Sequence, residues 1–268
     1  MRWILVAMIT SMIFFPDSVI YERPEDFGIA YEDVRFSAED GTALHGWYLK
    51  APQENGVILH LHGNAGNISA RVSKMRGWLE RGYSVFLVDY RGYGKSSGKI
   101  RHGEDLIRDA RGALHWLAGI KRIEIRKIVF YGESVGTYPA LFLATEHAAS
   151  AVILEAPFTS FRELARKHYA FMPDFLLRPI LSDFVFDELS IVDRTKCPLF
   201  ILHGIQDEIC PVEMAQRLFE KAPEPKGIFL VPGGDHNRLA EIAGEDFWEK
   251  PFQFFQDLKN RKHFEQKS

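Results

Sequence analysis

The feature that most constrains this chain is a serine inside the pentapeptide Gly-Glu-Ser-Val-Gly at residues 132–136. The apolar residues 128–131 before it favour a β-strand, and residues 137–144 after it favour the first turns of a helix. A sharp strand-to-helix turn projects the serine hydroxyl into a cleft, and a Cβ two residues before or after the serine would clash with the neighbouring strand and helix. The pattern therefore predicts that Ser134 is a nucleophile presented at the edge of an α/β sheet.

Two later residues complete a catalytic arrangement. Asp207 follows the apolar run 198–202, and His236 follows the apolar run 227–231, so both lie past the carboxyl ends of predicted strands. The order serine, aspartate, histidine is the one expected of this type of hydrolase. A serine hydroxyl becomes a good nucleophile when an imidazole takes its proton, and a carboxylate holds that imidazole in the required tautomer. We predict Ser134 as nucleophile, His236 as base and Asp207 as the acid.

Other residues offer alternatives to this arrangement. Glu155 ends a predicted strand and could replace Asp207 as the triad acid. His60 and His62 share one face of a strand, as metal ligands do, but no carboxylate or histidine follows at a spacing typical of a zinc site. We expect no metal and no organic cofactor.

The oxyanion of an acyl-transfer reaction needs backbone N–H donors. One is expected from Val135, directly after the nucleophile. The other is expected from the glycine-rich loop 62–67 that follows the apolar strand 57–61, with Asn64 as first choice and Ala65 as the alternative. Within this loop we expect His62 to shape the backbone rather than to act as a base.

Several of these segments carry a resemblance to a known family. They are His-Gly-Asn-Ala-Gly-Asn at 62–67, Asp-Tyr-Arg-Gly-Tyr-Gly-Lys-Ser at 89–96, the pentapeptide at 132–136, His203-Gly204 with Asp207, and Gly-Asp-His-Asn at 234–237. The chain resembles the α/β-hydrolase superfamily, specifically the abhydrolase-domain serine hydrolases of the membrane-anchored, depalmitoylase-like branch. The resemblance covers roughly residues 30 to 255 and implies the same three triad residues. One departure is Cys210, where valine or isoleucine is commoner.

The order of predicted elements indicates the fold class. Strands are expected near 31–38, 43–50, 56–61, 83–88, 127–131, 151–155, 198–202 and 227–231, and helices near 67–81, 103–119, 135–147, 211–222 and 245–259. From the third strand onward a helix follows each strand, with a longer insertion after 151–155, which predicts a mostly parallel eight-stranded sheet with helices on both faces, the α/β-hydrolase fold. An apolar content of 46% and a charged content of 26% are ordinary for one globular domain, and a net charge of −3 without a basic stripe excludes a nucleic-acid partner. We place this catalytic domain at residues 22–260, with a polar tail at 261–268.

Residues 158–194 interrupt the alternation of strands and helices. The stretch is rich in phenylalanine and carries two prolines, which indicates a small helical cap over the active site. An apolar cap suits a hydrophobic acyl substrate. The alternative is that these side chains only dock the cap onto the sheet.

Residues 1–21 are predicted to be an apolar anchor or signal-like segment. The apolar run 3–15 is shorter than the ~20 residues of a membrane span, and no small-residue cleavage site follows it. We expect an uncleaved signal-anchor-like segment that associates the protein with a membrane. Arg2 before the run and acidic residues after it favour a translocated domain. The alternatives are a cytoplasmic protein and an apolar helix packed on the domain.

These patterns together predict a serine hydrolase that cleaves carboxylic ester or thioester bonds through an acyl-enzyme intermediate. The expected substrate is a small molecule or an acylated protein with a hydrophobic acyl group. A serine peptidase or amidase on the same fold is the alternative enzyme. A non-catalytic binding module is the alternative outside enzymes, although such a protein would normally have lost a triad residue.

Overall fold

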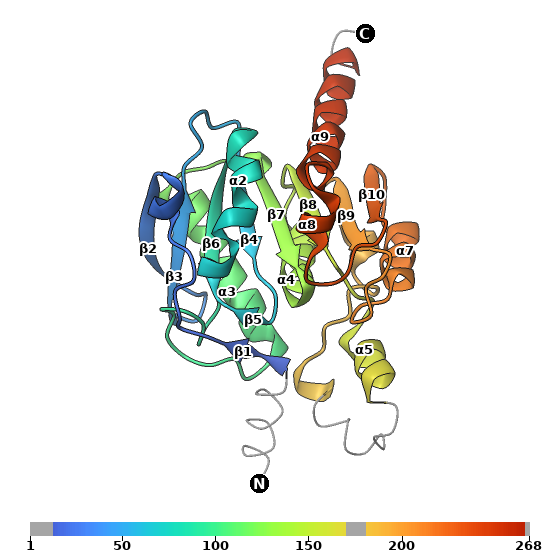
Figure 1. Ribbon diagram of the computed structural model, residues 1–268, viewed down its shortest axis with the longest axis horizontal. Coiled ribbons are helices and arrows are strands. Elements are labelled where there is room, and N and C mark those ends of the chain that lie inside the picture. Colours follow the sequence, from blue (N-terminus) through green and yellow to red (C-terminus); the bar gives the residue numbers. More distant parts are fainter. Residues whose placement is uncertain (1–12, 170–180, 266–268) are drawn as a thin grey trace.

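The computed structural model describes residues 13–169 and 181–265, and these build one sheet of eight strands with helices on both faces (Figure 1). The strands are β2 (Tyr31–Ser37), β3 (Ala43–Leu49), β4 (Gly56–Leu61), β6 (Tyr83–Asp89), β7 (Ile128–Glu133), β8 (Ala151–Glu155), β9 (Leu199–Gly204) and β10 (Lys226–Val231). Their order across the sheet is β10-β9-β8-β7-β4-β6-β3-β2. β3 is antiparallel to both β2 and β6, and every other pair in this sheet is parallel. The predicted mostly parallel α/β-hydrolase sheet is confirmed.

Two layers of helices cover the sheet. The helices are α2 (Val72–Glu80), α3 (Gly103–His115), α4 (Thr137–Glu146), α5 (Phe161–His168), α7 (Val212–Lys221), α8 (Leu239–Ala243) and α9 (Asp246–Glu265). Buried residues of α3, α4 and α7 belong to one hydrophobic core, and those of α2, α8 and α9 belong to the other. Each face of the sheet therefore has its own apolar layer.

The central strands read as continuous apolar runs because both of their faces are buried. In β4, Val57, Leu59 and Leu61 pack into the core with α3 and α4, whereas Ile58 packs into the core with α2. Alternate side chains of a strand point to opposite faces, so a strand covered on both sides needs apolar residues at every position. All six residues of β4 are buried.

The described parts of the predicted cap, 158–169 and 181–194, contribute to the hydrophobic core on the face of the sheet that α3, α4 and α7 cover. Its helix α5 is capped by the Ser160 side chain, which accepts a hydrogen bond from the N–H of Glu163. Phe158, Phe184 and Phe186 are each no more than 2% exposed and belong to the core that contains α3 and α4. These three side chains therefore dock the segment onto the domain.

The predicted membrane association through an N-terminal signal-anchor-like segment is wrong. Over residues 13–169 and 181–265, the structure contains no helix with the length and apolar character needed to span a bilayer. Residues 1–12, which hold most of the apolar run, lie outside the described residues. Residues 13–21 lie against the domain: Phe14 is buried in the core, and β1 (Phe15–Pro16) pairs in parallel with β5 (Ala65–Gly66) (Figure 1).

Candidate active site

Ser134 lies on a strained turn between β7 and α4. Its φ of +52° is in the left-handed region that a residue with a side chain rarely adopts. A Cβ at Gly136 would stand 2.1 Å from the carbonyl oxygen of Leu61, and one at Gly132 would stand 2.4 Å from the carbonyl oxygen of Gly136. Glycine at both positions thus lets the turn pass close to β4 and to its own helix.

The turn brings Ser134 to His236, and His236 to Asp207. The Oγ of Ser134 lies 3.0 Å from Nε2 of His236, and Nδ1 of the same ring lies 2.7 Å from Oδ2 of Asp207. Because a carboxylate accepts, Nδ1 carries the hydrogen, and Nε2 is left to accept the proton of the serine hydroxyl. The chain folds residues 102 positions apart into this contact.

Asp207 is held in place by its own loop. Its Oδ1 accepts hydrogen bonds from the backbone N–H groups of Ile209 at 2.9 Å and Cys210 at 2.8 Å, and the residue is only 5% exposed. The loop of Asp207 lies very close to the loop of His236: a Cβ on Gly204 would be only 2.3 Å from the carbonyl oxygen of Gly234. This close approach of two glycines sets the separation between the carboxylate and the imidazole.

The predicted oxyanion loop presents one unused donor. Asn64 accepts at its backbone oxygen from the N–H of Phe15 at 2.9 Å and from the hydroxyl of Tyr93 at 2.7 Å. Its backbone N–H makes no hydrogen bond to any of residues 13–169 and 181–265. Asn64 and Ala65 line the same pocket as Ser134 and His236. Val135, the other predicted donor, directly follows Ser134 in the turn.

His62 holds the backbone of the oxyanion loop. Its Nδ1 donates to the carbonyl oxygen of Gly63 at 2.7 Å, and its ring packs against the rings of Tyr90 and Tyr93. Burial lowers the pKa of His62 to about 4, so the ring is neutral at physiological pH. It holds the peptide that carries the N–H of Asn64.

A cluster of charged residues lines the same pocket, which has a volume of about 380 Å³: Arg71, Lys74, Glu133 and Glu155. Of these, the sequence suggests a possible role only for Glu155. Lys74 Nζ contacts Oε2 of both Glu133 and Glu155, and Arg71 reaches Oε1 of Glu133 at 3.0 Å. Burial alone would raise the pKa of Glu133, but the two cations hold it well below its usual range. The wall of the pocket is therefore a set of paired charges.

Glu155, the alternative triad acid, belongs to this group of paired charges. Its Oε2 accepts from the hydroxyl of Tyr131 at 2.7 Å and from Lys74 at 2.9 Å. The carboxylate that accepts the hydrogen bond from His236 is instead that of Asp207. A sequence signal for this wall did exist: Glu133 lies inside the pentapeptide, and Arg71 and Lys74 are three residues apart on a predicted helix, hence on one face.

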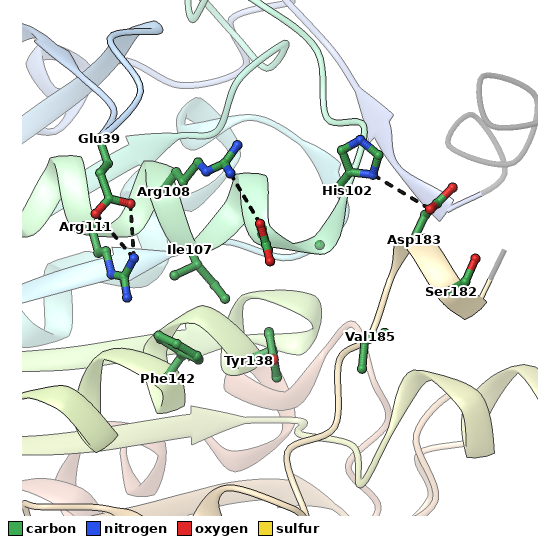
Figure 2. Close-up of a pocket in the computed structure, with 12 residues that line it drawn as sticks. Glu39, His102, Ile107, Arg108, Arg111, Tyr138, Phe142, Ser182, Asp183 and Val185 are labelled. Atoms are coloured by element: carbon green, nitrogen blue, oxygen red, sulfur yellow. Dashed lines mark hydrogen bonds and ion pairs between the residues drawn. The ribbon is translucent and has the colours of Figure 1, made fainter. Parts of the chain in front are cut away.

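A second hollow, of about 610 Å³, lies between α3, α4 and residues 182–185 (Figure 2). Its rim carries paired charges, among them Arg111 with Glu39, and His102 with Asp183 at 3.9 Å. Neither Ser134 nor His236 lines it. The nucleophile Ser134 and its base His236 both line the smaller pocket.

Comparison with known proteins agrees with this fold. Residues 52–188 match the family described as serine aminopeptidase, S33. An uncharacterized protein of Mycobacterium tuberculosis is 34% identical over 84% of this chain and 79% of its own length. The alpha/beta hydrolase domain-containing protein WAV2 of Arabidopsis thaliana is 30% identical over 98% of this chain and 94% of its own. An esterase of Pyrococcus furiosus has the same fold, with a TM-score of 0.76 at 23% identity over 91% of this chain and 97% of its own. The chain therefore belongs to the serine aminopeptidase, S33, family, and it is a hydrolase with the α/β-hydrolase fold.

Proposed function

We propose that this protein is a serine hydrolase that cleaves carboxylic ester or thioester bonds through Ser134, His236 and Asp207. Its predicted substrate carries a hydrophobic acyl group. The observation that carries the proposal is the chain of two contacts, 3.0 Å from Ser134 to His236 and 2.7 Å from His236 to Asp207. That geometry is the one required for a base to take the serine proton while a carboxylate stabilises the resulting imidazolium.

The reaction proceeds in two steps. His236 accepts the proton of Ser134 as its Oγ attacks the substrate carbonyl, and the N–H groups of Val135 and Asn64 stabilise the tetrahedral oxyanion. His236 then protonates the leaving alcohol or thiol, which departs and leaves an acyl-serine. Water, deprotonated by His236, attacks the acyl-serine, and the acid is released with Ser134 regenerated. Every group in this scheme belongs to the chain.

A peptidase or amidase is the second candidate, because the matched family is described as a serine aminopeptidase. An aminopeptidase needs a carboxylate available to bind the substrate's ammonium group. Two of the three carboxylates that line the pocket are already engaged, Glu133 by Arg71 and Lys74, and Glu155 by Lys74, and the third, Glu241, is exposed near Arg238. This pairing favours esters and thioesters over substrates with a free amino terminus.

The two cysteines are poor rivals to Ser134 as nucleophile. Cys197 and Cys210 are both buried, and burial raises the pKa of the Cys197 thiol to about 12 and that of Cys210 well above its usual value. The thiolate is the reactive form of cysteine, and both residues are protonated at neutral pH.

The prediction of a hydrophobic acyl group is based on the apolar composition of residues 158–194. Phe158, Phe184 and Phe186 of the predicted cap are buried in the core, so they supply no acyl pocket. Phe171 and Phe175 lie outside the described residues. A depalmitoylase-like activity on acylated proteins stays a prediction.

The test is to label wild type and Ser134→Ala with a fluorophosphonate probe, and then to assay p-nitrophenyl esters from acetyl to palmitoyl beside aminoacyl p-nitroanilides. We expect wild type alone to be labelled and the esters to be turned over faster than the anilides. Faster anilide turnover would favour the peptidase, and labelling of Ser134→Ala would refute the nucleophile. Folded wild type that is neither labelled nor active would be a binding module.

A further inference from the structure

Residues 13–21, which we call the N-terminal strap, run along the outside of the oxyanion loop (Figure 1). The N–H of Phe15 donates to the carbonyl oxygen of Asn64 at 2.9 Å, and the N–H of Asp17 donates to that of Gly66 at 3.3 Å. The side-chain amide of Asn64 donates in return to the carbonyl oxygen of Ile13 at 3.0 Å. The strap thus forms a short parallel ladder with the loop that carries a predicted oxyanion donor.

The ladder is fastened at both ends. At one end Phe14 is 3% exposed and packs against Phe184, with ring centroids 5.6 Å apart. At the other end the buried Asn67 donates from Nδ2 to the carbonyl oxygens of Asp17 at 3.0 Å and Val19 at 2.7 Å. The strap is therefore part of the folded domain on either side of its contact with Asn64.

The polar groups of Asn64 face two different parts of the structure, the strap and the pocket. Its carbonyl oxygen and its side-chain amide both face the strap, through Phe15 and Ile13. Its backbone N–H has no hydrogen-bond partner in the described part of the chain, and the residue lines the pocket of Ser134. Tyr93 also holds the carbonyl oxygen of Asn64, and His62 holds the peptide that carries its N–H. The strap adds to these contacts in setting the rotation of residue 64 and the direction of its N–H.

We propose that the N-terminal strap is a positioning element of the oxyanion hole, in which the backbone of Phe15 holds Asn64 so that its N–H points to the developing oxyanion. The proposal rests on the proposed function. Loss of an oxyanion donor typically lowers kcat by about 10²- to 10³-fold, and a displaced donor retains part of the effect. The strap therefore links the first part of the chain to the rate of the chemical step.

The test compares Phe15→Pro with Phe15→Ala in the full-length protein, using p-nitrophenyl acetate. The side chain of Phe15 is 52% exposed, and Pro16 already keeps residue 15 extended, so proline chiefly removes the N–H while alanine retains it. We expect kcat of Phe15→Pro to fall roughly 10- to 100-fold below that of Phe15→Ala. KM should be unchanged, as should the shape of the pH profile of kcat/KM.

A second pair of variants keeps the proposal testable if the proline variant does not fold. Asp17 is half-buried, and its Oδ1 accepts from the N–H of Val19 at 2.8 Å, which shapes the strap after β1. Asp17→Ala should lower kcat, and Asp17→Asn, which keeps an acceptor oxygen, should restore it. Equal kcat values for Phe15→Pro and Phe15→Ala, or for Asp17→Ala and wild type, would overturn the role of the strap. Turnover by Ser134→Ala would instead overturn the proposed function, so the two failures are distinguishable.

Discussion

At the scale of single residues, the site depends on a few side chains held by constraints that are local and severe. Ser134 keeps a φ of +52° because Gly132 and Gly136 leave no atom in its way. Asp207 is oriented by two backbone N–H groups before it meets His236. Such constraints prepare the groups for reaction, so a change at any of them should lower turnover.

Asp207→Asn tests the assignment of the triad acid. An amide at position 207 cannot hold His236 in the tautomer that accepts the serine proton, and such changes lower kcat by about 10⁴-fold in other serine hydrolases. We expect a loss of that order in ester hydrolysis measured at saturating substrate. Glu155→Gln serves as the comparison and should cost much less, because Glu155 contacts Tyr131 and Lys74. A larger loss in Glu155→Gln would make Glu155 the acid.

Gly136→Ala tests the packing of the turn. The added methyl group would stand 2.1 Å from the backbone oxygen of Leu61, which cannot move without shifting β4. We expect a loss of about 1–3 kcal/mol in the free energy of unfolding, together with reduced fluorophosphonate labelling. Gly119→Ala is a suitable control, because its nearest neighbour is the exposed ring of His115 at 3.3 Å. Equal unfolding midpoints for the two variants in urea would contradict the argument.

At the scale of elements, a buried carboxyl joins the end of the predicted cap to the start of α4. Glu188 is fully buried, and its Oε1 contacts Oγ1 of Thr137, which also donates to the carbonyl oxygen of Ser134. Thr137 has one hydroxyl hydrogen to give. If the carbonyl oxygen takes it, Glu188 must be the donor of its own contact and is therefore protonated. Burial correspondingly raises the pKa of Glu188 well above 4.5, although Thr137 acts in the opposite direction.

Glu188→Gln should remove a dependence of stability on pH. A carboxyl whose pKa is raised on folding contributes its full stability below the unfolded pKa near 4.5, and loses it as the pH rises through the folded pKa. Glutamine stays neutral and can donate to Thr137. The free energy of unfolding of the variant minus that of wild type should therefore rise between pH 5 and 8. The slope is about 1.4 kcal/mol per pH unit where Glu188 is protonated in the folded state and ionised in the unfolded state. Thermal unfolding at several pH values measures this, and a constant difference would show that Glu188 is already ionised.

At the scale of the whole molecule, one buried cation connects three separate parts of the chain. Arg91, which is 5% exposed and follows β6, contacts Asp40 in the turn between β2 and β3, and Asp109 in α3. It also contacts Asp105 at 3.1 Å. The antiparallel edge of the sheet, its centre and a covering helix therefore meet at a single guanidinium group.

Arg91→Ala should destabilise the protein strongly. The change leaves buried carboxylates without their cation, and breaking a buried ion pair in this way costs about 3–5 kcal/mol. Arg126→Ala is the matched control, since Arg126 pairs with Glu124 on the surface and such pairs contribute about 1 kcal/mol or less. Urea unfolding followed by circular dichroism gives both values. A loss below about 1 kcal/mol in Arg91→Ala would show that the carboxylates find other partners.

The sequence by itself determined the strands, most of the helices and the nucleophile turn, because these depend on neighbouring residues. Each predicted strand of the eight agrees with the structure to within a residue or two at its ends. The triad residues could be named for a similar reason: each lies just past the end of an apolar strand, and parallel strands bring those ends together.

Only the tertiary structure decided the rest, because it depends on contacts between residues far apart in the chain. The charged wall joins Lys74 to Glu155 across 81 positions, and nothing in their local sequence indicates this pairing. The N-terminus is the clearest case. An apolar run predicts burial, but burial in lipid and burial in protein leave the same signal in a short segment. Phe14 lies in the protein core, and the strap that follows it lies against Asn64.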